Sequence, residues 1–322
     1  MKLGVLTVLF GNRSLEDTLK YLAPLGVQAV ELGCGGYVGN AHANPKELLA
    51  NPEKIIALKD LVKKYNMEIS ALSVHGNVVH PDKAVAADYD EQFHNTMLLA
   101  EKLGVERVVN FSGCPGESPT GKCPNWVVQP WPDDFTKIYN YQWNDVIFPY
   151  WEKTATFAKD HGVKVCIEMH PGFCVYNPES FLKLRNAIGE TIGCNFDPSN
   201  IMWQGINPSA AIRKLGKSIY HVHAKDSSED MANILVNGRL DPKPYTDETH
   251  RAWIFRVLGF VHDTLVWKDM MSDLVMQGYD DVISIEHEDT LMTATEGFEK
   301  AVEFLKSVMI FEKSTGLWWA NQ

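Results

Sequence analysis

Short apolar runs recur along the whole chain at intervals that suit β-strands. Each run is rich in Val, Ile or Leu and is bounded by Gly, Pro, Asn or Asp, which is typical of buried strands. The stretches predicted as strands are residues 2–10, 27–32, 68–74, 107–111, 164–169, 192–196, 219–223 and 282–285.

Between these runs, apolar residues recur at the spacing of amphipathic helices. Strict alternation of strand and helix indicates parallel strands joined by crossover helices. Eight such strands predict a (β/α)8 TIM barrel. The predicted helices include residues 15–22, 54–65, 91–103, 151–160, 178–187, 209–215 and 295–308.

The chain is expected to form a single barrel domain over residues 1–322. Its 322 residues, 45% hydrophobic and 22% charged, suit one such barrel. Two connections on the rim, about 112–144 and 225–263, are unusually long. Connections of this length are usually lids, binding loops or partner surfaces, although each could also pack on itself. The first contains many aromatic residues, including Trp126, whose faces would suit a sugar ring or a flat aryl ligand.

Charge and composition exclude several classes of partner. Lys and Arg total 30 against 41 Asp and Glu, a net charge of −11 without a basic stripe, so no nucleic acid is expected as a ligand. No apolar stretch approaches membrane-spanning length, and the N-terminus reads as a strand rather than a signal peptide, so a cytoplasmic protein is expected. The six cysteines include no Cys-x-x-Cys and are expected to be free thiols, with a Cys114–Cys123 disulfide as the less favoured alternative.

Four predicted strands of the C-terminal half each deliver an acid or an imidazole near their end. In a closed parallel barrel these ends meet at one rim, so the four side chains should converge. Carboxylates and an imidazole form a suitable ligand set for a hard or borderline divalent cation. Any one of them could instead be a solvated or hydrogen-bonded loop residue, but four in phase predict a metal site. The predicted ligands are Glu168, Asp197, His223 and Glu286.

Other polar residues follow strand ends at the same rim. His170 shares a strand face with Glu168 and precedes Pro171, which favours an extended backbone and makes His170 the predicted base. Glu31 ends the second strand and His75 follows the third. Each could bind substrate hydroxyl groups, or could instead support a neighbouring ligand or loop.

Two further residues lie in phase with His223. Residues two apart on a strand share a face, so His221 and Lys225 should point the same way as His223. Lys225 could form a salt bridge with Asp226 or another acid, or it could have a catalytic role. His221 is expected to be a packed histidine that donates to a neighbour.

The motifs around these residues resemble those of the sugar phosphate isomerase/epimerase superfamily, which has xylose isomerase-like barrels. They read Ile-Glu-Met-His-Pro, Asn-Phe-Asp-Pro-Ser-Asn, His-Val-His-Ala-Lys-Asp and Ser-Ile-Glu-His-Glu-Asp, and the resemblance covers essentially the whole chain. It implies that the four predicted ligands hold a divalent metal, commonly Mn²⁺, with Mg²⁺ or Co²⁺ as alternatives. Members of this superfamily isomerise, epimerise, dehydrate or cleave sugars and related small molecules.

Three positions depart from the ketose 3-epimerases that the chain resembles. Those enzymes carry a second Glu, a His and an Arg where this chain has Cys174, Asn200 and Glu229. The departures disfavour simple 3-epimerisation of a free ketohexose. Asn200 is kept as a candidate substrate-binding residue.

Other stretches resemble a branch of the superfamily that acts on oxidised glycosides. The Lys-Asp after His223 is similar to that of inosose dehydratase-like members, and the stretches Asn110-Phe-Ser-Gly-Cys-Pro-Gly and Pro124-Asn-Trp resemble the α subunit of C-glycoside deglycosylases. The resemblance implies a metal-dependent lyase that cleaves 3-keto-C-glycosides by enolisation and β-elimination, with Trp126 as a candidate substrate contact. A sugar isomerase, epimerase or keto-sugar dehydratase, and a non-catalytic sugar-binding barrel, are the alternatives.

The expected partners follow from the same resemblance. A sugar or glycoside would be the small-molecule ligand, and an oligomer is expected. A small second subunit could dock on the apolar pair Trp318-Trp319, although both side chains could instead pack on the bottom of the chain's own barrel.

Overall fold

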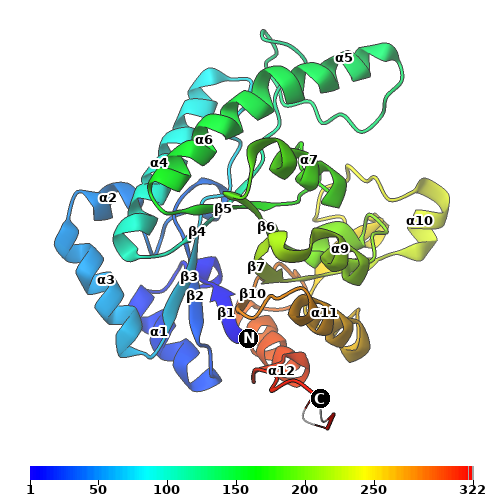
Figure 1. Cartoon of the computed structure of the whole chain (residues 1–322). Helices are drawn as coiled ribbons and strands as arrows, with labels where there is room; N and C mark the ends of the chain where they lie inside the picture. The colour runs from blue at the N-terminus through cyan, green and yellow to red at the C-terminus, as the bar shows by residue number, and fades with distance from the viewer. Residues whose placement is uncertain (318, 321–322) are drawn as a thin grey trace.

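The computed structural model describes residues 1–317 and 319–320 and contains a closed barrel of eight parallel strands. Its order is β1-β10-β7-β6-β5-β4-β3-β2, so strands adjacent in the barrel also follow one another along the chain, and β10 closes the ring against β1 (Figure 1). This confirms the predicted (β/α)8 fold. The barrel strands are β1 (Lys2–Leu6), β2 (Ala29–Gly33), β3 (Glu68–Ser73), β4 (Arg107–Phe111), β5 (Lys164–Glu168), β6 (Ile192–Phe196), β7 (Ile219–Ala224) and β10 (Val282–Ile285).

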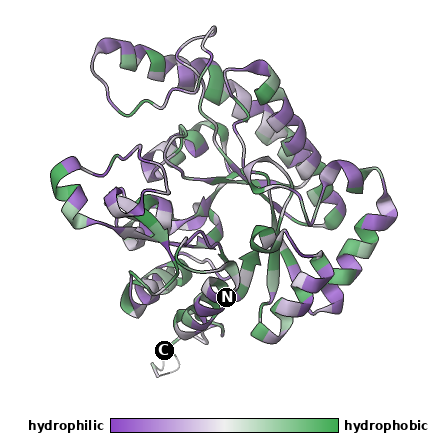
Figure 2. Cartoon of the chain, turned by 180° about the vertical axis from the view of Figure 1, so that it is seen from behind, coloured by the Kyte–Doolittle hydropathy of each residue, from purple (hydrophilic) through white to green (hydrophobic). Residues whose placement is uncertain are grey.

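Helices surround the barrel on all sides (Figure 1). Their apolar residues pack against the strands while hydrophilic residues alternate with them along each helix (Figure 2). Local sequence determines where several begin: the side chain of Asn177 accepts a hydrogen bond from the backbone N–H of Ser180 at the start of α7, and Pro178 follows it. The surrounding helices are α1 (Leu15–Leu22), α3 (Pro52–Lys64), α4 (Lys83–Leu103), α6 (Phe148–Asp160), α7 (Pro178–Ile188), α9 (Pro208–Leu215), α11 (Thr264–Met276) and α12 (Ala294–Val308).

Two elements differ from the pattern-based prediction. The first strand ends at Leu6, and Thr7–Phe10 forms a 3-10 turn (η1), because the apolar run continues past the point where the chain turns at the rim. Helix α11 was not predicted, since apolar residues cover most of its length and give little helical periodicity. Short elements at other connections are α2 (Pro45–Leu49), α8 (Pro198–Met202), η2 (Ala23–Leu25), η3 (Gly36–Val38), η5 (Gly216–Ser218) and η6 (Glu248–His250).

The connection at residues 112–144 carries structure of its own. It contains α5 (Asp133–Tyr141), which projects from the barrel in Figure 1, and a π-helical turn, η4 (Gln142–Ile147), that leads into α6. The buried amide of Gln142 donates hydrogen bonds to the carbonyl groups of Pro115, Gly116 and Asn125. One side chain thus holds the start of this insert against its end.

The connection at residues 225–263 also folds into regular elements. Strands β8 (Asp226–Glu229) and β9 (Trp253–Arg256) pair antiparallel, and α10 (Met231–Asn237) lies between them. Arg256 contacts Glu248 of the same insert and Asp289 of the loop after β10. Asp289 also accepts a hydrogen bond from the backbone N–H of Val257, so the hairpin is fixed to that loop.

Several other expectations can be compared with the described residues. All six cysteines are free, as predicted, and Cys114 is buried while Cys123 is exposed. No helix of the described chain has the length and apolarity needed to cross a bilayer. Of the C-terminal pair, Trp318 lies outside the described residues, and the side chain of Trp319 is 70% exposed.

Candidate metal centre

Three of the four predicted metal ligands meet at the carboxyl ends of β5, β7 and β10. Nδ1 of His223 lies 3.3 Å from Oε2 of Glu168 and 3.1 Å from Oε2 of Glu286. The candidate ligand atoms of these three residues all lie within 4.8 Å of one another. The barrel therefore brings together residues that are far apart in the sequence.

The fourth predicted ligand, Asp197, lies next to this group. The amide of Asn200 donates to Oε1 of Glu168 at 2.9 Å and to Oδ2 of Asp197 at 2.8 Å. The other oxygen of Asp197 accepts hydrogen bonds from the backbone and hydroxyl of Ser199 at the start of α8. Asn200, predicted as a substrate contact, is buried with its amide bound to these carboxylates.

The electrostatics of this group favour a positive charge among its oxygens. Burial alone would lower the pKa of His223, but the neighbouring carboxylates, Glu31 first, raise it well above its ordinary value. Burial, with Glu168 and Glu286 nearby, raises the pKa of Asp197 to about 8 despite the attraction of Lys225. A divalent ion would stabilise the ionised form of Asp197 and would place positive charge beside Nδ1 of His223.

One oxygen of the group is also left without a donor. Oε2 of Glu286 is buried and has no hydrogen-bond partner of acceptable geometry among the described residues, although Nδ1 of His223 lies 3.1 Å away. Carboxylate oxygens with one imidazole nitrogen are a donor set that suits Mn²⁺, Mg²⁺ or Zn²⁺. The residues present therefore fit a divalent metal.

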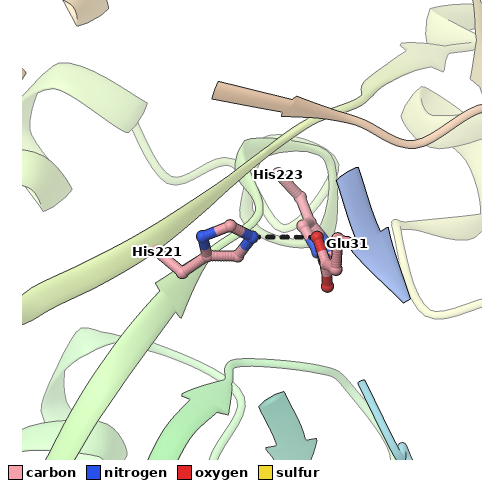
Figure 3. A group of neighbouring side chains, drawn as sticks. All are labelled: Glu31, His221 and His223. Atoms are coloured by element: carbon pink, nitrogen blue, oxygen red, sulfur yellow. Dashed lines mark hydrogen bonds and ion pairs between the residues drawn. The ribbon is translucent and has the colours of Figure 1, made fainter. Parts of the chain in front are cut away.

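Glu31, for which substrate binding and a supporting role were both left open, lies buried beside His221 and His223 (Figure 3). Nε2 of His223 is 2.9 Å and 3.0 Å from its two oxygens, and Nε2 of His221 is 2.8 Å from Oε2. The hydroxyl groups of Ser73 and Ser284 also donate to it. Glu31 is completely buried with both oxygens bound to protein groups, so the structure does not present it to a ligand. His221 is packed and hydrogen-bonded, as predicted.

Glu31, His221 and His223 could also be considered as a second metal site, since their ligand atoms cluster. Their separations of 2.8 to 3.0 Å are, however, hydrogen-bond lengths, and every contact has an available donor. Burial alone would raise the pKa of Glu31, but His223 and His221 lower it well below its ordinary value. An ionised Glu31 therefore orients the His223 ring from below, as carboxylates behind metal-bound histidines commonly do.

Two buried residues hold Glu168 in a similar way. Nε2 of His75 lies 3.0 Å from Oε2 of Glu168, and the amide of Asn195 donates to the same oxygen at 2.8 Å. His75 thus supports a predicted ligand, which is one of the two roles left open for it. Asn195 was not predicted, although its place two residues before Asp197 on β6 puts both on one face.

Lys225 forms salt bridges with Glu286, a predicted metal ligand, and with Glu288, which was not predicted from the sequence. Its Nζ lies 3.2 Å from Oε1 of Glu286 and 2.5 Å from Oε2 of Glu288. Burial alone would lower the pKa of Lys225, but Glu286, Glu288 and Asp197 raise it well above its ordinary value. The residue is therefore a buried ammonium group. Glu288 could have been found from its position two residues after Glu286.

His170 lies at the mouth of the barrel beside aromatic rings. Its Nδ1 is 2.6 Å from the carbonyl oxygen of Pro171, an arrangement in which Nδ1 donates and Nε2 keeps its lone pair. Its ring centroid lies 4.9 Å from that of Phe111 and 5.6 Å from that of Phe173. Burial lowers the pKa of His170, which favours the neutral imidazole.

A cavity of about 510 Å³ lies next to Lys225, which contacts two of its lining residues, Glu288 and Phe255. None of the four predicted metal ligands is among the described residues that line it. We call it the aromatic cavity, because five of its lining residues are Phe or Tyr. Trp126 is not among its lining residues; its ring packs edge-on against Tyr176 at 5.4 Å, and its contact with substrate stays a prediction. The cavity is lined by Tyr37, Phe111, His170, Phe173, Tyr245, Ile254, Phe255, Glu288 and Thr290.

Comparison with known proteins agrees with this architecture. The chain is 38% identical over 312 residues to the uncharacterized protein YfiH of Bacillus subtilis (strain 168), covering 96% of this chain and 99% of that protein. Among solved structures, the IolI protein with a bound zinc atom superimposes with a TM-score of 0.65 at 19% identity, covering 96% and 98% of the two chains. The probable 3-DHS dehydratase AsbF of Bacillus anthracis also gives a TM-score of 0.65, at 16% identity, covering 95% and 99%. The xylose isomerase-like TIM barrel family matches residues 19–308. The chain therefore belongs to the xylose isomerase-like TIM barrel family.

Proposed function

We propose that the protein is a divalent-metal-dependent enzyme that removes a proton next to the carbonyl group of an oxidised sugar. The observation that carries this proposal is the convergence of Glu168, His223 and Glu286 beside the buried ammonium group of Lys225, which in turn contacts the lining of an open cavity. The IolI protein, which shares the fold, has a bound zinc atom, and this supports the proposal of a divalent metal. We expect Mn²⁺ first, because the donors are mainly carboxylates, with Mg²⁺ or Co²⁺ as alternatives.

The side chains near the cavity would each have a separate role in such a reaction. A bound divalent metal would polarise the carbonyl group and stabilise negative charge on its oxygen. His170 lines the cavity with its Nδ1 bound to the carbonyl oxygen of Pro171, and its Nε2 would accept the carbon-bound proton. Lys225 carries a positive charge next to Glu286 and would hold a substrate oxygen or donate a proton to a leaving group. A placed base or acid typically contributes about a hundredfold to ten-thousandfold in rate.

Within this class, we propose β-elimination, with release of the aglycone from a 3-keto-C-glycoside as the first candidate. Lys225 lies where it could protonate a leaving group, and the aromatic cavity beside it would accept an aryl group. The dehydratase AsbF, which shares the fold, also carries the name of an elimination reaction. Isomerisation or epimerisation is the second candidate, because the same proton removal followed by reprotonation would produce it.

Incubation of Mn²⁺-loaded protein with 3-keto-C-glycosides and free keto-sugars in D₂O separates these reactions. We expect release of the aglycone that depends on the metal, and chromatography measures this release. Deuterium in a recovered sugar without fragment release would show an isomerase or epimerase instead. Neither exchange nor release with any substrate, also in the presence of a partner subunit, would contradict an enzymatic role.

Two variants assign the chemistry to this site. Glu286→Gln should abolish turnover, because it removes a negative charge from the ligand set. Lys225→Met should lower kcat at least a hundredfold while Mn²⁺ still binds, because the nearby carboxylates lose a competing cation. Isothermal titration calorimetry measures the binding. Full activity of Glu286→Gln would remove this residue from the site.

The assembly and the cellular location stay predictions. A small second subunit is proposed because the apolar side chain of Trp319 is exposed near the C-terminus. Light scattering after size-exclusion chromatography would measure the expected oligomer.

A further inference from the structure

The aromatic cavity has both an acidic side and an aromatic side. We propose that it admits uncharged substrates with a flat apolar group and rejects phosphorylated sugars, and that Glu288 determines the second property. This inference rests on the proposed function only in taking the aromatic cavity as the substrate site.

The acidic side occupies a place where many barrels of this fold bind phosphate. Such sites are frequently formed by the loops after the seventh and eighth barrel strands. Here the eighth barrel strand, β10, is followed by the sequence Glu286-His287-Glu288-Asp289. Glu288 lines the cavity with its side chain half-exposed, and Asp289 is buried behind it. A phosphate group in this place would meet negative charge.

The nearby cations are already matched by acids. Lys225 is bound to Glu286 and Glu288, and Arg256 is bound to Glu248 and Asp289. The described residues that line the cavity include no lysine and no arginine. Phosphate recognition usually needs such a cation or several backbone N–H groups.

A bound divalent metal would not change this balance. The three acids Glu168, Asp197 and Glu286 would compensate its two positive charges. The cavity would therefore remain without surplus positive charge. A sugar phosphate would have to give up hydration without gaining an opposite charge in return.

The aromatic side is built from two stacked pairs that come from different parts of the rim. Phe111, the last residue of β4, and Phe173, in the connection after β5, have ring centroids 4.3 Å apart and planes inclined by 23°. Tyr245 and Phe255, from the insert after β7, have centroids 6.0 Å apart and planes inclined by 22°. Rings held in place by their neighbours offer flat faces on which another flat group can stack.

The position of Lys225 links the two sides. Its ammonium group lies 4.2 Å from the centroid of the Phe255 ring and 2.5 Å from Oε2 of Glu288. A substrate could thus place its polar ring toward Lys225 and the metal centre and its flat substituent among the aromatic rings. The two sides together favour an uncharged glycoside with an aryl group.

Binding of three simple probes tests the inference without any turnover. Isothermal titration calorimetry would compare phenyl β-D-glucopyranoside, methyl β-D-glucopyranoside and glucose 6-phosphate on the full chain, with and without Mn²⁺. We expect the phenyl glycoside to bind roughly tenfold more tightly than the methyl glycoside. Glucose 6-phosphate should bind more weakly than either. Equal affinity of the phenyl and methyl glycosides, or tightest binding of glucose 6-phosphate, would overturn the inference.

Variants test which residue causes the preference for the phenyl glycoside and which causes the rejection of the phosphate. Phe173→Leu keeps an apolar side chain but removes the flat face, and should remove most of the preference for the phenyl glycoside. Glu288→Gln should strengthen glucose 6-phosphate binding roughly three- to tenfold, because it removes a negative charge and frees Lys225. Phe260→Ala, an exposed aromatic residue outside the cavity, serves as the control. An unchanged phosphate affinity in Glu288→Gln would contradict the role of Glu288.

The outcome is separable from that of the proposed function. Absence of exchange and fragment release would reject the proposed reaction even if the phenyl glycoside binds as expected. Absence of selective binding would reject the inference even if a small keto-sugar is turned over.

Discussion

Glu31 is a buried carboxylate that holds the candidate metal ligand His223 from the side opposite its Nδ1. It is ionised, and it accepts hydrogen bonds from the hydroxyl groups of two serines and from Nε2 of both His223 and His221. These contacts fix the plane of the His223 ring and therefore the direction of Nδ1. Fixed orientation of a ligand lowers the entropy that is lost when the metal binds.

Replacing Glu31 should therefore weaken metal binding. Glu31→Gln keeps the size of the side chain but loses the charge and one acceptor, so we expect Mn²⁺ affinity to fall roughly 10- to 100-fold. Titration calorimetry measures this affinity. Glu16→Gln, at an exposed acid paired with Lys64, is the matched control and should bind Mn²⁺ as the wild type does. Unchanged affinity of Glu31→Gln would show that Glu31 has no positioning role.

At the scale of elements, the two long inserts differ in their relation to the cavity: the insert after β7 contributes to its described lining residues, and the insert after β4 does not. The insert after β7 contributes Tyr245, Ile254 and Phe255, and Arg256 fixes it to the loop after β10. The insert after β4 is held by the Gln142 amide at the π-helical turn. Such turns often occur at functional sites, because they redirect a helix and free its backbone groups.

Gln142→Leu should loosen the first insert. It leaves the carbonyl groups of Gly116 and Asn125 without this donor, while the carbonyl group of Pro115 keeps the backbone N–H of Asn125. We expect the loss to cost about 1–3 kcal/mol of stability. Limited proteolysis should then cut residues 115–125 faster than in the wild type. Gln129→Leu, exposed on the same insert, should not change the cleavage rate. Equal cleavage of both variants would contradict the role of Gln142.

The insert after β7 should also respond to pH. Nδ1 of His262 is 2.6 Å from Oδ1 of Asp226, and this hydrogen bond raises the pKa of His262, with Glu229 and Asp263 also raising it. A raised pKa in the folded state gives stability that is fully present below the unfolded value of about 6.5. That stability is lost as pH rises through the higher pKa of the folded protein.

Thermal unfolding of His262→Gln between pH 6 and pH 9 measures this contribution. The wild type should have the higher Tm at pH 6, and the difference should shrink as pH rises. A difference that stays constant over this range would show that protonation of His262 is not involved.

At the scale of the whole molecule, metal binding should be linked to folding. The candidate ligands come from β5 and β7 and from the residues that directly follow β6 and β10, so they meet only when the barrel is closed. A metal that binds only the folded chain stabilises it by mass action, by about 2.7 kcal/mol at a hundred times Kd. We expect Mn²⁺ to raise Tm and EDTA to reverse the rise. A similar rise in Glu168→Gln would place the metal elsewhere.

Much of the barrel could be predicted from the sequence, because its strands are buried and its helices are amphipathic. The boundaries of β4, β6 and β10 coincide with the apolar runs that predict them. The inserts could not be predicted in the same way. Strands β8 and β9 pair with each other, 24 or more residues apart, and their residues follow no strong alternation.

The candidate metal centre was predictable in part for a geometric reason. All strands of a closed parallel barrel end at one rim, so phase along each strand indicates which side chains meet there. Phase alone could not show that Glu31 holds His223, that Asn200 bridges Glu168 and Asp197, or that Glu288 binds Lys225. These contacts depend on depth within the barrel and on the course of the rim loops.

The pattern of apolar and polar residues by itself determined the fold class and the residues that gather at the rim, because strand periodicity and barrel closure depend on local hydrophobic order. Only the tertiary structure decided which of those residues face the cavity, which lie buried behind them, and what charge the cavity carries. Those properties arise from contacts between strands and inserts that are far apart along the chain, and no local pattern encodes them.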